Sequence, residues 1–444
     1  MIKFLHYCFV AFLLFSTTSC ANIFEKEKQK IEGGRIPIGD LEQKLNITVS
    51  SSSLHVNPVS KTNSSWQYLT AFGGKENFHL PENLYLQKKF KVSRSGVLPI
   101  ISYPIVLNES LILMGKNGTI YNYNTNKGKI NWVNKTFFSK KIKISRDYLN
   151  GGLSYEKDKL FATSGNNKVI CIDLNTGNVL WMAQLQSMTR SVPYITSDKL
   201  IIQTLDNGVY ALDKETGKVL WHNIGINDGI SILYSVTPIV YENYVILQSN
   251  SFQPHYLDIN NGNEEQIFQN NDFLKSTFHL DLKKDNNVKI YQPVLDKQIL
   301  FFYDEKGDFY AINLKFNNMI WKKKYHVNVP FLINGNIIFA INEQNQLLFI
   351  DKYNGDLVFI LDLNQYLDEK SNSKVFWSTP VIANSTIKVS NSVGKLLTFD
   401  TETKKLLNTL EIPKDTYIPP VIANDCMYIV SSRGEALKYG EKNR

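Results

Sequence analysis

An Asp and a Gly recur at a fixed spacing in this chain, and their chemistry is the first question that the sequence raises. The clearest copies are CIDLNTGNVLW at residues 171–181 and ALDKETGKVLW at residues 211–221. The DLNTG stretch resembles the start of a calcium-binding loop, which places Gly at its sixth position and Glu at its twelfth. Here Gly177 is the fifth residue counted from Asp173, and no Glu follows at the twelfth. We therefore interpret the Asp as an acceptor for N–H groups of the turn and the Gly as a residue with positive φ.

The other chemically active residue types form no recognisable catalytic or metal-binding motif. The seven His residues, at positions 6, 55, 79, 222, 255, 279 and 326, give neither HxH nor HExxH spacing. The chain contains no CxxC, no P-loop, no G-x-S-x-G and no G-x-G-x-x-G. Cys171 and Cys426 lie in apolar, strand-like runs, where an isolated thiol behaves as a small hydrophobic side chain. The sequence therefore predicts no catalytic residue, no metal site and no cofactor-binding residue.

Cys20 is the one residue for which the surrounding sequence predicts covalent chemistry. Lys3 precedes an apolar run over residues 4–15, and small residues at 16–19 lead to Cys20. This order is typical of a secretory signal, and the run is too short to span a bilayer. A Cys after small residues also resembles a bacterial lipobox, in which the thiol receives a diacylglycerol. The alternative is ordinary signal cleavage after Ala21.

Composition places the rest of the chain among globular proteins. It has 444 residues, with 43% hydrophobic, 12% aromatic and 20% charged residues. The net charge of +8 is spread along the sequence, so it indicates a solvated basic surface and not a nucleic-acid partner. We expect residues 1–20 to be a signal peptide with a lipobox-like end. Residues 21–63 are rich in Ser, Asn and Thr, which is typical of a flexible tether.

A repeat of roughly 40–50 residues extends over the remaining sequence, and such a period with strand-like runs is typical of a β-propeller. Each copy ends at an anchor position eight residues after its Asp or Asn. The anchors are Trp132, Trp181, Trp221, Gln266, Trp321, Phe359 and Asn408. Upstream of the anchors lie Pro-led pairs of strands, for example at 192–208 and 379–394. We expect the repeated Trp to pack between neighbouring blades and not to contact a ligand.

Counting the repeats predicts how the ring closes. Seven copies are complete, while an eighth at 419–440 lacks its outer strand, and an orphan strand at 83–92 precedes the first copy. Pairing 83–92 with the strand at 434–440 would leave no open edge between the ends of the ring. The sequence thus predicts an all-β, eight-bladed propeller of four-stranded blades over residues 64–440, with the last blade closed by the N-terminal strand.

The A-[LI]-D-x-x-T-G-K-x-[LI]-W copies are similar to the pyrroloquinoline-quinone-type propeller repeat. Two classes of protein share that repeat: quinone-dependent dehydrogenases and the BamB family, the lipid-anchored propellers of the outer-membrane β-barrel assembly (BAM) complex. The stretches at 63–74, 189–221 and 418–439 resemble the BamB family. This resemblance implies a non-enzymatic lipoprotein on the periplasmic face of the outer membrane. Such a scaffold assists the insertion of β-barrel proteins and needs no cofactor.

Two other functions stay open at this point. A quinone-dependent dehydrogenase on this fold needs a calcium site with a catalytic Asp, and often a vicinal disulfide that clamps the cofactor. This sequence has no Cys-Cys pair, and its acidic residues mostly lie in turns. The other alternative is a substrate-binding periplasmic propeller of a different system.

The same resemblance implies where a partner would bind. In the BamB family an exposed loop with an Arg near apolar residues contacts the barrel-inserting subunit, BamA. The matching stretch is LQSMTRSVP at 185–193, with Arg190 in the Arg position and Leu185 and Met188 as its apolar neighbours. The alternative for Arg190 is an ordinary solvated charge. A second family contact is not carried over, because Val288 and Ile290 replace its acidic residues, and client outer-membrane proteins remain an open class of partner.

Overall fold

The structure is a computed structural model, and its description covers most of the chain after residue 54. The described residues are 55–59, 62–67, 77–91, 102–115, 118–137, 151–189, 191–206, 208–224, 237–248, 254–265, 293–303, 307–316, 318–367, 375–416 and 418–442. The chain divides into residues 1–47 and residues 48–444, and the fold below is that of the second part. Cys20, with the expected signal peptide and most of the expected tether, lies outside the described residues.

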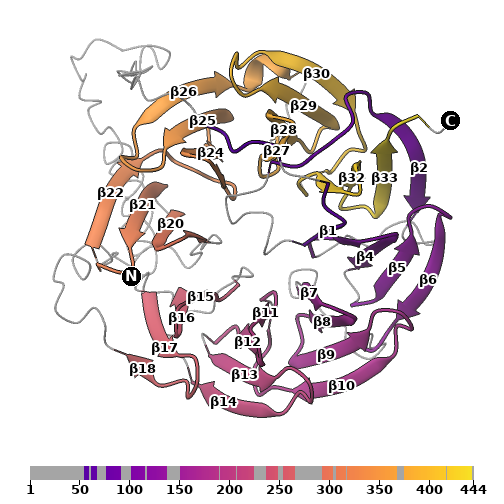
Figure 1. Ribbon diagram of the computed structural model, residues 1–444, viewed down its shortest axis with the longest axis vertical. Helices are drawn as coiled ribbons and strands as arrows, with labels where there is room; N and C mark the ends of the chain where they lie inside the picture. Colours follow the sequence, from indigo (N-terminus) through magenta and orange to yellow (C-terminus); the bar gives the residue numbers. More distant parts are fainter. Residues whose placement is uncertain are drawn as a thin grey trace, which may run out of the picture. The chain divides into compact units, whose positions relative to one another are not determined.

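Eight antiparallel sheets follow one another around a ring (Figure 1). Each sheet is one blade, and in blades 1–7 the strands run in chain order from the centre of the ring to its rim. Blade 1 contains β3 (Ile105–Leu107), β4 (Ser110–Met114), β5 (Ile120–Asn124) and β6 (Lys129–Asn134), and β1 (Ser65–Trp66) adds a fifth strand beside β3. Blade 2 contains β7 (Gly152–Glu156), β8 (Lys159–Thr163), β9 (Lys168–Asp173) and β10 (Val179–Gln184). Blade 3 contains β11 (Tyr194–Ile195), β12 (Lys199–Gln203), β13 (Val209–Asp213) and β14 (Val219–Asn223).

The next four blades repeat this arrangement. Blade 4 contains β15 (Ile239–Tyr241), β16 (Tyr244–Gln248), β17 (Pro254–Asp258) and β18 (Glu264–Glu265). Blade 5 contains β19 (Val294–Asp296), β20 (Ile299–Tyr303), β21 (Asp308–Asn313) and β22 (Asn318–Lys324). Blade 6 contains β23 (Leu332–Asn334), β24 (Ile337–Ile341), β25 (Gln346–Asp351) and β26 (Leu357–Asp362), followed by a short 3-10 helix, η2 (Asn364–Tyr366). Blade 7 contains β27 (Val381–Ala383), β28 (Thr386–Ser390), β29 (Lys395–Asp400) and β30 (Leu406–Glu411).

Blade 8 joins the two ends of the propeller, as the repeat count predicts. It combines β31 (Val421–Ala423), β32 (Cys426–Val430) and β33 (Glu435–Gly440) with the outer strand β2 (Tyr85–Lys91). The antiparallel register runs from Tyr85 opposite Gly440 to Lys91 opposite Glu435. The eight-bladed, all-β fold and the closure by the N-terminal strand are therefore both confirmed. In the described part of the chain no helix is long and apolar enough to cross a membrane.

The core lies between consecutive blades, because each sheet buries both of its faces against its neighbours. Second strands such as β24 are buried along their whole length, whereas outer strands such as β22 bury one residue amid exposed ones. Between blades 2 and 3, for example, Phe161 and Cys171 share an apolar cluster with Leu200 and Leu212. This explains why inner strands are continuous apolar runs and outer strands are mixed.

In the four repeats that have an anchor Trp, this side chain packs on the next blade, as expected from the sequence. The Trp132 ring covers Gly177, and a Cβ added at Gly177 would lie 2.6 Å from the ring. The indole N–H of Trp132 donates to the Leu174 carbonyl at 2.8 Å. The same arrangement of ring on Gly joins Trp181 to Gly217, Trp221 to Gly262 and Trp321 to Gly355. Gly is required in these turns both for its positive φ and because the ring leaves no room for a side chain.

Repeats without a Trp differ at the Gly position as well. In the sequence, Gln266 and Phe359 replace Trp in two of the repeats, and the repeats that follow have Asn317 and Lys404 in place of Gly. On blade 8, the outer strand places Lys88 at this position, and its side chain lies over Gly128 of blade 1. Among the described turns, Gly therefore lies beneath each Trp and beneath Lys88, whereas Lys404 follows the blade that carries Phe359.

Candidate partner-binding site

The stretch expected to contact a partner, residues 185–191, connects the outer strand of blade 2 to the inner strand of blade 3. It begins with Leu185, whose side chain is only 2% exposed and belongs to the core between these blades. The Leu185 N–H donates to the Asn167 carbonyl at 2.7 Å, and the Asn167 amide donates to the Leu185 carbonyl at 3.0 Å. The structure thus places Leu185 beneath the surface, where it supports the connection and offers no apolar surface to a partner.

Met188 is the apolar residue that this connection does expose. Its side chain is 49% exposed, and its carbonyl accepts a hydrogen bond from the Leu205 N–H at 2.8 Å. The backbone at Met188 is therefore fixed to the hairpin turn of blade 3 while its thioether faces solvent. An exposed, flexible and polarisable side chain on a fixed backbone can pack against an apolar partner.

Arg190 lies outside the described residues, but both of its neighbours are buried and hydrogen-bonded. Thr189 is fully buried, and its hydroxyl donates to the Gln203 carbonyl at 3.0 Å. The Ser191 side chain is 2% exposed, and its hydroxyl donates to the same carbonyl at 3.1 Å. The Thr163 hydroxyl in turn donates to the Ser191 carbonyl at 2.6 Å. The residues on either side of Arg190 are thus held to blades 2 and 3.

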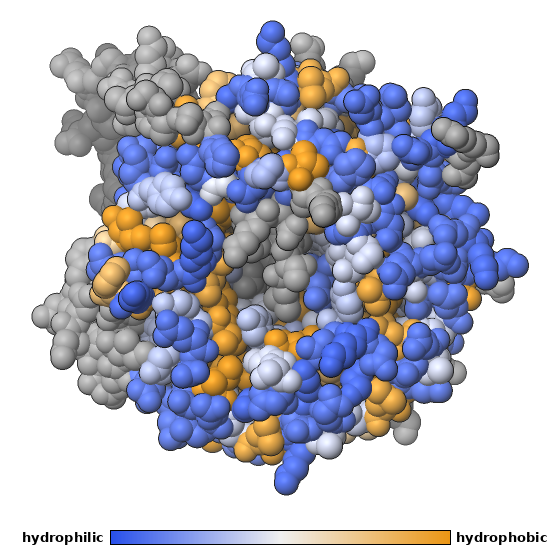
Figure 2. Space-filling model, viewed as in Figure 1, coloured by the Kyte–Doolittle hydropathy of each residue, from blue (hydrophilic) through white to orange (hydrophobic). Residues whose placement is uncertain are grey.

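Sequence reasoning missed further exposed apolar residues, which lie on the outer strands of blades 2 and 3. The outer strand β10 exposes Leu180 and Met182, at 50% and 53%, and β14 of blade 3 exposes Leu220 at 47%. The sequence runs V-L-W-M and V-L-W could have indicated these residues. In a strand, side chains alternate between the two faces, so the residues beside an inward-facing Trp face outward. Figure 2 shows that orange, apolar residues are scattered among predominantly polar ones over the face it presents.

The turn carboxylates are used by their own turns, as expected from the sequence. Asp173 Oδ1 accepts hydrogen bonds from the N–H of Asn175 at 3.1 Å and from the N–H and hydroxyl of Thr176 at 2.7 and 2.8 Å. The Thr176 hydroxyl, with the turn N–H groups, holds the pKa of Asp173 below its ordinary value. Asp213 makes the same set of bonds with Glu215 and Thr216. These carboxylates organise turns, so they are poor candidates for acid–base chemistry.

The remaining reactive groups are buried or dispersed. Burial raises the pKa of the Cys171 thiol to about 12 and also raises the pKa of Cys426, so neither thiol is a ready nucleophile. Across the described ranges, no three His, Cys, Asp or Glu side chains gather in a way that could hold a metal ion. The stretch of the second family contact, residues 283–293, lies outside the description except for its last residue.

Comparison with known proteins finds one family model and two relatives that are similar in sequence. The family model for outer membrane protein assembly factor BamB matches residues 116–361. An uncharacterised protein of Rickettsia conorii is 25% identical over 369 residues, which cover 81% of this chain and 86% of the relative. An uncharacterised protein of Rickettsia prowazekii is 24% identical over 361 residues, which cover 79% and 85%.

Solved structures share the fold at low sequence identity. BamB from Moraxella catarrhalis superposes with a TM-score of 0.59 at 14% identity, over 82% of this chain and 99% of that chain. The quinohemoprotein alcohol dehydrogenase of Comamonas testosteroni superposes with a TM-score of 0.60 at 10% identity, over 85% and 82%. These two likenesses concern the fold alone. The family match is the finding that goes further, because it covers more than half of the sequence, and by it the chain belongs to the BamB family of PQQ-like repeat β-propellers.

Proposed function

We propose that this protein is a non-enzymatic scaffold lipoprotein that assists the assembly and insertion of β-barrel proteins into the outer membrane. The observation that carries the proposal is the family match over residues 116–361, which extends from blade 1 to the outer strand of blade 6. A propeller suits such a role because its rigid blades hold the connecting loops in fixed positions for a partner. In this proposal the chain needs no cofactor and acts from the periplasmic face of the outer membrane.

The partner in this proposal is a BamA-like barrel-inserting subunit, and the contact is the connection at 185–191. Two features of the structure support it: Met188 is exposed, and the residues on both sides of Arg190 are hydrogen-bonded to the blades. A guanidinium on such a support can pair with a carboxylate of the partner with little loss of backbone entropy. Leu185 then does not contact the partner, and it supports the connection by packing in the core beneath it.

Membrane attachment in this proposal occurs through an acylated Cys20. The first described residue of the propeller side is His55, which is hydrogen-bonded to blade 6. Residues 21–54 would then join the lipid to the propeller, and at about 3.3–3.6 Å per residue they could reach at most about 110–120 Å. That length allows the propeller to bind a partner whose site lies well away from the bilayer surface.

Affinity purification from detergent-solubilised membranes tests the proposal. The full-length chain should co-purify with the barrel-inserting subunit, identified by mass spectrometry. A membrane-bound, folded protein that recovers no subunit of the barrel-assembly complex would contradict it.

The alternative is a dehydrogenase-like propeller, which is favoured by the likeness in fold to quinoprotein dehydrogenases such as the Comamonas testosteroni enzyme. Reduction of an artificial electron acceptor by the purified protein, supplied with pyrroloquinoline quinone and calcium, would support that alternative and overturn the scaffold.

A further inference from the structure

The residues before the outer strand β2 lie across the propeller and are hydrogen-bonded to it. We call residues 55–59, 62–67 and 77–80 the N-terminal strap. At blade 6, the His55 N–H donates to Asn336 Oδ1 at 2.8 Å, and the Asn336 N–H returns a bond to the His55 carbonyl at 3.0 Å. The Asn57 N–H donates to Asn334 Oδ1 at 2.8 Å. A Cβ at Gly335 would lie 1.8 Å from the His55 carbonyl oxygen, so the strap rests directly on this turn.

The strap next reaches blades 8 and 1. The Asn424 N–H donates to the Asn63 carbonyl at 2.7 Å, and the Asn63 amide donates to the Ile422 carbonyl at 2.8 Å. The Thr62 hydroxyl donates to Asp425 Oδ1 at 2.9 Å. The Ser64 carbonyl accepts from the Asn108 N–H of blade 1 at 2.9 Å, and β1 then pairs with β3. One short segment therefore joins the last blade to the first at the centre of the ring.

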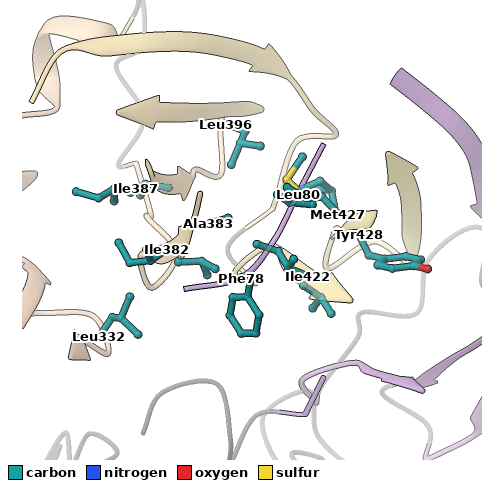
Figure 3. Packing of buried hydrophobic residues seen from close by; sticks show 14 of the residues in the cluster. Phe78, Leu80, Leu332, Ile382, Ala383, Ile387, Leu396, Ile422, Met427 and Tyr428 are labelled. Atoms are coloured by element: carbon teal, nitrogen blue, oxygen red, sulfur yellow. The ribbon is translucent and has the colours of Figure 1, made fainter. Parts of the chain in front are cut away.

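The returning part of the strap docks on blade 7. The Phe78 N–H donates to the Ile382 carbonyl at 3.2 Å, and the Leu80 N–H donates to Asn384 Oδ1 at 3.1 Å. Both side chains are buried in the apolar cluster that also contains Ile382 and Ile422, as Figure 3 shows. The Asn77 amide donates to the Asn57 carbonyl at 2.8 Å and thereby connects the two passes of the strap.

The hairpin turns under the strap differ in sequence from those that it does not cross. The first turn residue is Gly335, Asn384, Asn424 or Asn108 in blades 6, 7, 8 and 1. In blades 2, 4 and 5 the same position holds Lys157, Glu242 and Lys297, which are exposed. All seven adopt positive φ, which Asn and Gly accept more readily than Lys or Glu. At this first turn position the chain thus carries Asn or Gly in the four blades where the strap docks, and Lys or Glu in blades 2, 4 and 5.

In the outer part of the ring, the two interfaces of blade 8 are less apolar than the interface between blades 2 and 3. Blade 2 presents the row Phe161, Cys171 and Trp181 to its neighbour. The corresponding row of blade 7, facing blade 8, is Lys388, Thr398 and Asn408, and that of blade 8, facing blade 1, is Tyr428, Lys438 and Lys88. Replacing aromatic side chains by lysines reduces the apolar area that each interface buries.

Lys388 shows that placing a lysine in this row destabilises the interface between blades 7 and 8. Its side chain is 8% exposed, and among the described residues its ammonium has one hydrogen-bond partner, the Thr398 hydroxyl at 3.4 Å. Lys352 of blade 6 is equally buried, but it pairs with the Asp296 carboxylate at 2.8 Å. A buried ammonium without a carboxylate destabilises the interface that contains it.

We propose that the N-terminal strap is a latch that holds blade 8 in the ring. Strands β31–β33 are the part of the ring that opens first, because both of their interfaces carry lysines and their outer strand comes from the other end of the chain. The strap opposes this opening at the centre, since its hydrogen bonds join blade 8 to blades 6, 7 and 1. Opening and closing of blade 8 are thus governed by a segment that precedes the propeller in the sequence.

Hydrogen exchange of the full-length protein, followed by mass spectrometry, tests the latch. The Asn63→Ala and Asn336→Ala substitutions together remove bonds from both ends of the first pass. Exchange in β31–β33 and β2 should accelerate about tenfold or more, while exchange in β12–β14 of blade 3 should stay unchanged. Asn243→Ala changes the same turn position in blade 4, where no described strap residue docks, and it should leave exchange in blade 8 unaltered.

Two outcomes would overturn the latch. One is equal acceleration in blades 3 and 8, which would make the strap an ordinary contributor to global stability. The other is unchanged exchange in β31–β33, which would show that the strap does not hold that blade. Asn336→Ala alone, which changes one turn side chain, keeps the test decisive if the double variant fails to fold.

Discussion

Trp181 of blade 2 lies on Gly217 of blade 3 and donates its indole N–H to the Lys214 carbonyl at 3.1 Å. The pair explains why the Trp and the Gly recur together in the sequence. Each of Trp132, Trp181, Trp221 and Trp321 meets the Gly of the following repeat. The repeated pair of Gly and Trp in the sequence therefore reflects a contact between neighbouring blades.

The first prediction follows from this contact. Gly217→Ala would place a Cβ 2.5 Å from the Trp181 ring at a residue with a φ of +73°. We expect the free energy of unfolding to fall by about 2–4 kcal/mol, through overpacking and backbone strain together. Urea unfolding followed by tryptophan fluorescence measures the change.

Lys404 supplies the matched control for this prediction. It occupies the same turn position in blade 7 with a φ of +60°, and the preceding blade has Phe359 in place of Trp. Lys404→Gly should be neutral or should stabilise by up to about 1 kcal/mol, because Gly accepts positive φ without strain. Equal effects of Gly217→Ala and Lys404→Gly would refute the contact as the reason for the Gly.

Much of the fold could be predicted from the sequence, because each repeat is defined by residues that are close together in the chain. The spacing of Asp173 and Trp181 marks a C-terminal hairpin of a blade, and counting the copies identifies β2 as the missing strand of blade 8. The closure needs no knowledge of contacts, since an unpaired strand at each end of the sequence is sufficient.

The strap and the burial of Leu185 could not be predicted in the same way. Residues 55–63 have the Ser- and Asn-rich composition of a linker, yet the described ones bond to backbone groups and to Asn side chains of turns. Hydrogen bonds of this kind require no regular spacing of hydrophobic residues, so the sequence carries no pattern that would predict them. Leu185 reads as part of an exposed loop, but the next blade packs over it. Both outcomes depend on neighbours that are distant in sequence.

The second prediction concerns pH and Lys388. Burial lowers the pKa of Lys388 to about 8 from the value of 10.5 expected in the unfolded chain. Between these values the folded state has released the proton and the unfolded state retains it, so this group makes stability rise with pH. Below pH 8 the cost of burying the charge, about 3 kcal/mol, is present in full.

Lys388→Met removes that cost and the pH dependence that comes with it. The variant should be more stable than wild type at pH 7, and the difference should shrink as the pH rises from 8 to 10.5. Lys352→Met is the control, and it should destabilise by about 3–5 kcal/mol because it leaves Asp296 buried without its cation. A constant difference between wild type and Lys388→Met over this range would contradict the prediction.

The third prediction separates the partner contact from its support. Arg190→Ala should leave the free energy of unfolding nearly unchanged but weaken the complex with the barrel-inserting subunit by about 2 kcal/mol, roughly thirtyfold. Met188→Ala should act in the same direction, because this side chain is half exposed. Leu185→Ala should instead lower stability by about 2–5 kcal/mol, since it opens a cavity in the core. Co-purification equal to wild type by both surface variants would refute this contact.

The last prediction concerns membrane attachment. If the Cys20 thiol carries a diacylglycerol, Cys20→Ser should move the protein from the membrane fraction to the soluble periplasmic fraction. Residues 55–59 and 62–67 should still dock, because their bonds to Asn336 and Asn424 do not involve the lipid. Cys8→Ser is the control: it also removes a thiol, within the apolar run of the signal, but it should leave the protein in the membrane fraction.

Mass spectrometry of the mature N-terminus supplies the direct measurement, with an acylated Cys20 as the expected first residue. An unmodified N-terminus at Asn22 would show cleavage after Ala21, and the propeller would then reach its partner without an anchor of its own.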